Sequence, residues 1–477
     1  MSTRALLALV GLAGFACLAP AQEGANAFDE RFTGRSLRFD YHHAGTASEE
    51  HVAPDALRLE GPWPGSRTRL VDDTGMGKYR FAVVDPASGE LLYSRGFASI
   101  YGEWETTAEA RAQWRVFHES QRFPEPRAPV ELVLEKRGAD GSFAEIWRQV
   151  IDPASRFVDR SALSGDVAVH ALFENGPPAT QVDLLIVAEG YTRDMQARFV
   201  ADAQRLTDVM FATEPFARRR DDFSVRALFV PSPEAGIPNP RRNEWPASAL
   251  GLSFNAFDSD RYVLTYANQT LREVAAHAPY DALIVLFAGR KYGGGGIFNL
   301  WSTCASDSAE APYLFVHEFG HSFGGLADEY YTSPVSYEDF VAPGTEPWEP
   351  NVTALLDPAK LKWRDLVASD TPLPTPWGKE TYDTLSREQQ AVRAEKIAAG
   401  ASEEEMEALF REVKAVTKPM LEGERYFGEV GAFEGAAYEA HGLYRPEVDC
   451  IMFTRNPTSF CKVCERGLER VIDLYAQ

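Results

Sequence analysis

The chain has few histidines and cysteines, and beyond its N-terminus it has no long hydrophobic run. Only nine histidines and five cysteines occur among 477 residues, so a cluster of these residue types stands out. The absence of a later apolar segment long enough to cross a bilayer predicts a protein without membrane insertion. Basic residues are also scarce, since 48 Lys and Arg against 70 Asp and Glu give a net charge of -22. This excess of negative charge argues against binding to nucleic acid or to anionic membrane surfaces.

The N-terminal segment 1–21 has the features of a signal peptide. Arg4 provides a positive charge, an apolar stretch follows, and Ala19-Pro20-Ala21 supplies the small residues of a cleavage site. The apolar stretch is too short to span a membrane. We therefore expect an exported protein that is secreted, periplasmic or held at the cell surface. A lipid anchor at Cys17 is not expected, because the residues before it lack the leucine that such signals usually carry.

Removal of this segment would leave four cysteines, Cys304, Cys450, Cys461 and Cys464. In an exported protein an even number of cysteines predicts two disulfide bonds, whose pairing the sequence leaves open. The spacing Cys461-x-x-Cys464 also suits metal binding. The alternative is therefore a structural zinc site of four thiolates, although export favours the disulfides.

The expected fold class is α+β or α/β, with two domains that differ in their hydrophobic pattern. Residues 22–165 predict an all-β, sandwich-like domain, because short alternating apolar runs are separated by turn sequences. These runs are 57–59, 79–84, 91–97, 130–136 and 143–150. Three histidines near the start of this domain are interpreted as surface residues: His42, His43 and His51.

Residues 175–477 predict a catalytic domain with a mixed sheet, because strands and helices alternate along them. The apolar runs 182–188 and 282–288 have the composition of strands buried on both faces. A helix with an apolar stripe is expected over 192–211, between these strands. The charged stretch at about 379–420 predicts a helical insertion.

Four consecutive glycines occupy residues 293–296. Bare backbone of this kind suits an edge strand that lies close to another chain, such as an extended peptide substrate. A flexible loop is an equally good interpretation of the composition. Both interpretations stay open at the level of the sequence.

The most informative segment is the pattern His317-Glu318-x-x-His321. Residues four apart on a helix share one face, so both imidazoles can bind one metal ion with Glu318 near a metal-bound water. Apolar residues 311–316 precede the pattern, and Gly324-Gly325 can end the helix. The segment predicts a zinc peptidase site. Two ordinary helix histidines beside a solvated carboxylate are the less favoured interpretation.

A catalytic zinc ion usually has three protein ligands and a water molecule. Asp328 is the favoured third ligand, ahead of its neighbour Glu329. On a continuous helix Asp328 would lie about 10 Å along the axis from His321, so the assignment requires a turn at Gly324-Gly325. Glu434, from a later element, is a further alternative. One Zn²⁺ per chain is expected.

Several segments together resemble a known family. The His-Glu-x-x-His-x-x-Gly pattern, a following acid and a later methionine resemble the metzincin zinc endopeptidases. The wider set is similar to the bacterial immunoglobulin A peptidase family of zinc metallopeptidases. The segments that carry this similarity are 317–330, 434–438, 443–446, 450–452 and 460–464. The resemblance implies an α/β catalytic domain, one zinc ion, and Met452 beneath the metal as a structural floor.

The chain departs from the metzincin pattern at two positions. The usual third ligand falls at Ala327, and the acid follows one residue later at Asp328. Thr454 occupies the position at which many metzincins carry a tyrosine that stabilises the oxyanion. Tyr438 and Tyr444 are the candidates for this role.

We therefore expect an exported zinc endopeptidase that cleaves protein or peptide substrates. His317, His321 and Asp328 would hold the metal, and Glu318 would act as general base. One alternative is an exported binding protein with a structural or degenerate metal site. Another is an exopeptidase with Glu434 as its third ligand. The substrate and the oligomeric state have no signature in the sequence.

Overall fold

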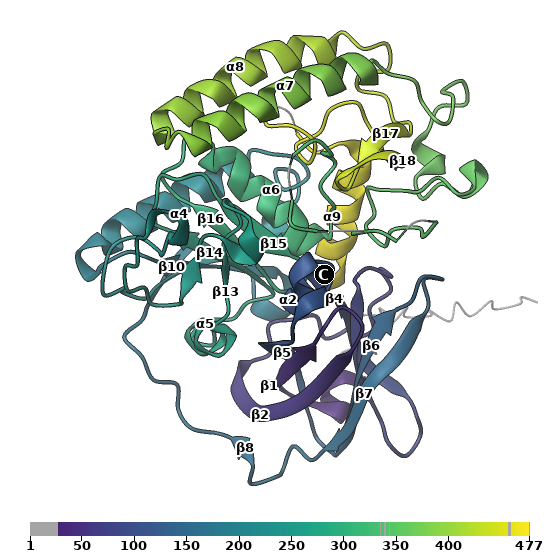
Figure 1. Cartoon of the computed structure of the whole chain (residues 1–477). Helices are drawn as coiled ribbons and strands as arrows, with labels where there is room; N and C mark the ends of the chain where they lie inside the picture. Colours follow the sequence, from purple (N-terminus) through teal and green to yellow (C-terminus); the bar gives the residue numbers. More distant parts are fainter. Residues whose placement is uncertain (1–26, 334, 338–339, 343, 457–458, 477) are drawn as a thin grey trace, which may run out of the picture.

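The computed structural model describes residues 27–333, 335–337, 340–342, 344–456 and 459–476. The expected signal peptide, 1–21, lies outside these residues. The described chain forms an N-terminal β module and a larger mixed α/β region (Figure 1). Within it, no helix combines the length and the apolar character needed to cross a bilayer.

The N-terminal β module consists of two four-stranded sheets with the orders β5-β1-β2-β8 and β4-β3-β6-β7. Their apolar side chains share one core, in which the rings of Phe81 and Phe123 lie 5.4 Å apart. The prediction of an N-terminal β module is confirmed. The strands are β1 (Phe32–Gly45), β2 (Glu50–Pro62), β3 (Tyr79–Val84), β4 (Leu91–Phe97), β5 (Arg115–Pro126), β6 (Val130–Arg137), β7 (Phe143–Ile151) and β8 (Val158–Asp159).

One of the three N-terminal histidines, His43, is not a surface residue. It is 1% exposed, and its ring nitrogens lie 2.9 Å from Glu119 Oε2 and 2.8 Å from Glu50 Oε1. Burial alone would lower the pKa of His43, but the charges and hydrogen bonds of Glu119 and Glu50 outweigh it and raise the pKa to about 9. The surface interpretation of His43 is therefore wrong, because its two carboxylate partners make burial possible. His51 is exposed, and His42 is half-exposed.

The α/β region is built on a six-stranded sheet with the order β15-β16-β14-β10-β11-β9. The four central strands are parallel, and β15 and β9 are antiparallel strands at the edges. Every residue of β10 and β11 is buried, as expected for strands covered on both faces. The strands are β9 (Ala168–Phe173), β10 (Val182–Glu189), β11 (Phe223–Phe229), β14 (Ala282–Phe287), β15 (Gly294–Ile297) and β16 (Trp301–Ala305).

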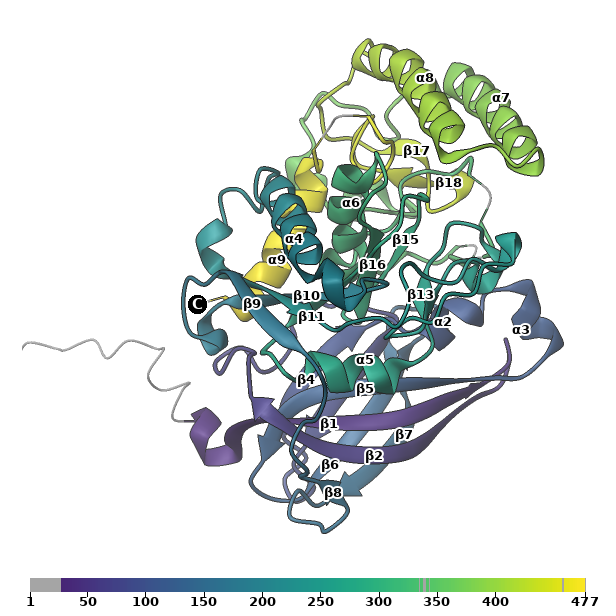
Figure 2. The same ribbon diagram turned by 90° about the vertical axis from the view of Figure 1, so that its left-hand side faces the viewer.

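Helices cover both faces of this sheet (Figure 2). On one face α6 (Ala311–Gly324) packs between α4 (Gln196–Met210) and α9 (Lys462–Tyr475). On the other face α5 (Asn268–Ala275) lies between the sheet and strand β5 of the N-terminal module. Two helices, α7 (Lys379–Ala398) and α8 (Glu403–Glu422), occupy the charged stretch and stand at the top of Figure 1. The shorter elements are α2 (Ile100–Trp104), α3 (Ala108–Ala112), β12 (Leu252–Ser253), β13 (Leu264–Thr265), β17 (Phe433–Ala436) and β18 (Glu439–Arg445).

The N-terminal module shares the core of the α/β region. Helix α2 and the residues around it pack into the larger hydrophobic cluster, with Tyr101 and Trp104 fully buried. The backbone N–H of Ala98 donates to the carbonyl of Phe298 at 2.9 Å, just beyond β15. These contacts hold the β module against the end of the sheet that carries the predicted site.

Candidate active site

Helix α6 carries both histidines of the motif. Pro312 lies in its first turn, where its missing N–H is not needed, and Gly325 ends the helix in a left-handed conformation with φ 60°. The helix packs against β14, β15, β16 and α9. His317 is only 3% exposed and Glu318 only 9% exposed, so the motif lies inside the fold.

The glycines of β15 allow this strand to lie directly against α6. A Cβ atom at Gly296 would come within 2.4 Å of the Glu318 carbonyl oxygen, and one at Gly294 would lie 3.3 Å from Glu318 Oε1. The segment is thus an edge strand, and the flexible-loop interpretation is wrong. Part of its outer edge is already occupied, because Gly294 exchanges backbone hydrogen bonds with Arg261 and Val263.

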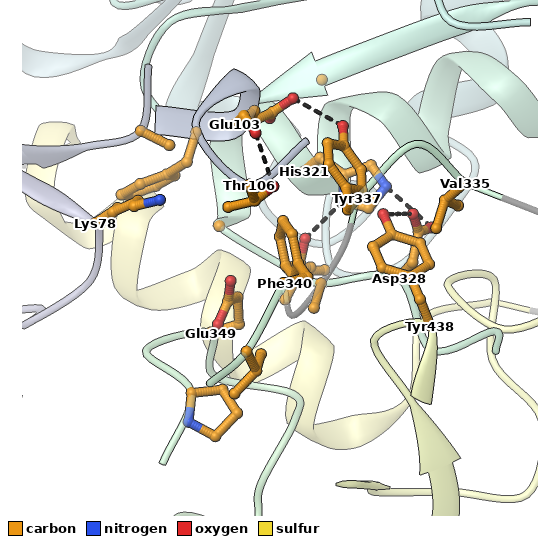
Figure 3. Close-up of a pocket in the computed structure, with 18 of the residues that line it drawn as sticks. Lys78, Glu103, Thr106, His321, Asp328, Val335, Tyr337, Phe340, Glu349 and Tyr438 are labelled. Atoms are coloured by element: carbon orange, nitrogen blue, oxygen red, sulfur yellow. Dashed lines mark hydrogen bonds and ion pairs between the residues drawn. The ribbon is translucent and has the colours of Figure 1, made fainter. Parts of the chain in front are cut away.

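His317, His321 and Asp328 converge at the start of the loop that follows α6 (Figure 3 shows His321 and Asp328). The two Nε2 atoms lie 3.1 Å apart, and Asp328 Oδ1 lies 3.1 Å and 3.3 Å from them. In a tetrahedral zinc site with bonds of about 2.0–2.1 Å, ligand atoms would be about 3.4 Å apart. Asp328 Oδ1 is buried and accepts no hydrogen bond from the described residues. The donor atoms and their spacing therefore fit a zinc ion.

Backbone carbonyls and a tyrosine orient these three side chains. The Nδ1 atom of His317 donates to the carbonyl of Ile451 at 3.0 Å, and that of His321 donates to the carbonyl of Leu326 at 2.6 Å. In the neutral imidazoles, each Nε2 then carries no proton and can bind a metal ion. Tyr438 donates to Asp328 Oδ2 at 2.6 Å.

The turn that contains Met452 packs directly against the motif helix. A Cβ atom at Gly320 would lie 3.1 Å from Met452 Sδ, so a larger residue there would require Met452 to shift. Met452 is fully buried. Met452 thus packs against α6, and its role as a floor beneath the metal stays a prediction.

The two alternative third ligands lie elsewhere. The Glu329 side chain points to Cys450, Cys461 and Cys464 instead of the histidines. Glu434 on β17 contacts His441 Nδ1 and the N–H of Gly442, each at 3.4 Å. Among the candidates named from the sequence, the structure brings Asp328 to the histidine pair.

The four cysteines of the described residues are free thiols, contrary to the expectation of two disulfides. Cys450, Cys461 and Cys464 belong to one cluster, which Cys304 does not join. Cys304 on β16 contacts the carbonyl oxygens of Ala305 and Ala311. Even the neighbouring sulfurs of Cys450 and Cys464 are 3.8 Å apart, whereas a disulfide requires about 2.05 Å.

The histidine pair and Asp328 line a cleft of about 400 Å³. The N-terminal module forms one wall with Lys78, Glu103 and Thr106, and the segment that contains Tyr337 lies beside this wall, bridged to Thr107 (Figure 3). Glu103 accepts hydrogen bonds from Tyr262 and from Tyr337, the latter at 2.9 Å. Burial raises the pKa of Glu103 to about 7, although these hydrogen bonds oppose the shift. The sequence carries no signal for Glu103, since it is a single glutamate in a short helix.

Glu318 faces the same cleft beside the histidines. Burial raises the pKa of its carboxyl group, while the charges of His317 and His321 act in the opposite direction. A carboxylate with a raised pKa is suited to accept and return a proton near neutral pH. This is the role that the sequence predicts for Glu318.

Two further residues of the cleft are missed by sequence reasoning. Arg261 and Tyr330 both line it, and Arg261 Nη2 donates to the Tyr330 hydroxyl at 2.9 Å. Arg261 lies in an irregular segment far from the motif along the chain, so only the fold brings it there. Of the tyrosines named from the sequence, Tyr438 lines the cleft, whereas Tyr444 pairs with Thr353 outside it.

Comparison with known families agrees with this geometry. Residues 170–472 match the model of the family IgA Peptidase M64, and residues 27–148 match that of the Peptidase M64 N-terminus. The chain belongs to the IgA peptidase M64 family. The resemblance to the immunoglobulin A peptidase family is thereby confirmed. No curated protein matches the chain significantly. Membership in the M64 family, whose members are metallopeptidases, indicates a hydrolase that acts on proteins.

Proposed function

We propose that this M64 peptidase is an exported, zinc-dependent endopeptidase. His317, His321 and Asp328 would hold the catalytic zinc ion, and Glu318 would act as general base. The observation that supports the proposal is the convergence of two imidazole Nε2 atoms and the unpaired Asp328 Oδ1 within 3.3 Å in the cleft. Two imidazoles and one carboxylate are a usual ligand set for catalytic zinc.

The zinc ion and the side chains of the protein would have different roles in the reaction. When bound, the zinc ion acts as a Lewis acid and lowers the pKa of water. Glu318 takes the proton of the attacking water and returns it to the leaving amine. The carbonyls of Ile451 and Leu326 keep the imidazoles in the tautomer that presents Nε2.

The oxyanion requires a donor, because Thr454 is engaged elsewhere. Its hydroxyl donates to Asp449 Oδ1 at 2.7 Å. Tyr330 lines the cleft, and its hydroxyl is fixed by the guanidinium of Arg261. We assign the oxyanion to Tyr330, because a preorganised donor in a site with little water stabilises developing charge most effectively.

The substrate would extend along β15. Gly294 already pairs with Arg261 and Val263, and the carbonyl of Phe298 accepts from Ala98. The edge between these two contacts would then receive an extended peptide as an additional strand. The histidine pair, the acid after a glycine turn and Met452 beneath α6 also support a metzincin-like relationship. Export would follow from the segment 1–21.

Glu318→Gln tests the general base. We expect the variant to bind zinc like the wild type, with kcat for protein substrates lowered by about 10²–10⁴-fold. Glu434→Gln is the matched control and should retain both zinc and activity, because Glu434 lies outside the cluster. Full activity in Glu318→Gln would refute the mechanism.

Asp328→Ala tests the third ligand. We expect this variant to lose the catalytic zinc and the activity together. Retention of the catalytic zinc ion in Asp328→Ala, together with its loss in Glu434→Gln, would support the exopeptidase alternative. Zinc bound to an intact wild-type site without hydrolysis of folded or unfolded proteins would support the binding-protein alternative.

A further inference from the structure

A second cluster of ligand-type side chains lies directly behind Asp328. It contains Glu329, Cys450, Cys461 and Cys464, whose ligand atoms all lie within 4.8 Å of one another. None of the four residues is more than 4% exposed. They come from three separate segments, since Glu329 follows Asp328, Cys450 precedes the Met452 turn, and Cys461 and Cys464 begin α9.

Two separations within this cluster are close to the edges of a metal tetrahedron. The sulfurs of Cys450 and Cys464 are 3.8 Å apart, and Glu329 Oε1 lies 3.3 Å from Cys464 Sγ. With zinc–sulfur bonds of about 2.3 Å and zinc–oxygen bonds of about 2.0 Å, tetrahedral geometry places two sulfurs about 3.8 Å apart and a sulfur and an oxygen about 3.5 Å apart.

The buried carboxylate of Glu329 is only partly satisfied by the protein. Asn351 donates to its Oε1 at 3.0 Å, whereas Oε2 accepts no hydrogen bond from the described residues. The nearby guanidinium of Arg445 donates to the backbone carbonyls of Gly435 and Val448. A buried carboxylate is costly without a partner of opposite charge. A cation among the four side chains would supply that charge.

The start of α9 supplies backbone N–H donors to two of the three sulfurs. The N–H of Cys461 donates to Cys450 Sγ at 3.3 Å, and the N–H of Cys464 donates to Cys461 Sγ at 3.4 Å. The N-terminus of a helix also stabilises negative charge. In metal sites, hydrogen bonds from backbone N–H groups to the sulfurs orient and stabilise the metal-bound thiolates.

We propose that Glu329, Cys450, Cys461 and Cys464 bind a structural zinc ion, in addition to the catalytic one. Four protein ligands complete a tetrahedral shell and leave no position for water, which is typical of structural zinc sites. The donor set replaces one thiolate of the four-thiolate alternative with Glu329, because Cys304 lies outside the cluster. This proposal does not depend on the identity of the catalytic ligands.

The second site supports the first through the backbone. The N–H of Glu329 donates to the carbonyl of Met452 at 2.8 Å. The residue after Cys450, Ile451, provides the carbonyl that orients His317. The structural zinc ion therefore ties the Asp328 loop, the Met452 turn and the start of α9 into one unit.

Cobalt substitution tests the site independently of activity. Co²⁺ bound to thiolates gives an intense near-ultraviolet charge-transfer band, which imidazole and carboxylate ligands do not give. We expect the full chain loaded with Co²⁺ to show this band. It should persist in His317→Ala, disappear or weaken strongly in Cys464→Ser, and be unchanged in the matched control Cys304→Ser.

The spectrum of the wild-type chain tests the proposed thiolate site even if a cysteine variant does not fold. A wild-type chain that takes up Co²⁺ but shows no thiolate band would overturn the proposal. So would a disulfide between Cys450 and Cys464, detected as missing free thiols when the unreduced chain is denatured in a chelator. Loss of catalytic zinc in His317→Ala while the band remains would separate the two sites.

Discussion

The hydroxyl of Tyr438 donates a hydrogen bond to Asp328 Oδ2 at 2.6 Å. We expect Tyr438→Phe to weaken zinc binding by roughly 10–100-fold, because partners of metal ligands usually contribute this much. Competition with a chelator measures the effect. Tyr444→Phe is the matched control, since Tyr444 does not line the cleft. Equal zinc affinity in both variants would contradict the positioning role of Tyr438.

Tyr330 provides a second prediction for a single residue. We expect Tyr330→Phe to lower kcat by about 10²–10³-fold, the effect of removing one oxyanion donor, with little change in KM. The zinc content should equal that of the wild type. Steady-state kinetics and metal analysis on the same preparation check both points. A variant that keeps its kcat would remove Tyr330 from the mechanism.

How far single residues can be predicted depends on how local their contacts are. His317, Glu318 and His321 could be grouped from the sequence because helix periodicity alone relates them. Asp328 could also be predicted, because the glycine turn after the helix brings it back towards the two histidines. Glu103 and Arg261 could not be predicted, because tertiary packing alone brings them to the cleft.

The contact between β15 and α6 is the element that shapes the cleft beside Glu318. We expect Gly296→Ala to destabilise the protein by about 1–3 kcal/mol, because the added Cβ would lie 2.4 Å from the Glu318 carbonyl oxygen and 2.9 Å from His321 Cβ. Activity should fall as the strand moves away. Thermal unfolding and peptide hydrolysis measure the two effects. Gly61→Ala is the control, since a Cβ there meets nothing within 4 Å.

The strands in which apolar and polar residues alternate could be predicted from the sequence. A strand was missed where buried, charged side chains interrupt this alternation. β3, β4, β6 and β7 follow the predicted runs closely. β1 is long and buried, yet it carries Arg38 and Asp40, whose side chains pair with each other inside the core. A pattern based on hydrophobicity assigns such residues to the surface. The pairing partners that permit their burial are visible only in the fold.

At the scale of the whole molecule, the N-terminal module is structurally integrated with the α/β region. Its helix α2 shares the core of the α/β region, and its residues Lys78 and Glu103 form a wall of the cleft. Stability of the module should therefore govern the integrity of the cleft. The interaction of the buried His43 with Glu119 and the partly buried Glu50 makes that stability sensitive to pH.

The sign of this dependence follows from the raised pKa of His43. An unfolded histidine titrates near 6.5, whereas His43 in the folded chain titrates at about 9. Its stabilisation is fully present below pH 6.5 and is lost as the pH rises through 9, by up to about 3 kcal/mol. We expect the Tm to fall over this range. His43→Gln should be less stable at pH 6.5 and lack this part of the decline, whereas the exposed His51→Gln should keep the wild-type profile. The same decline in His43→Gln as in the wild type would show that another group titrates.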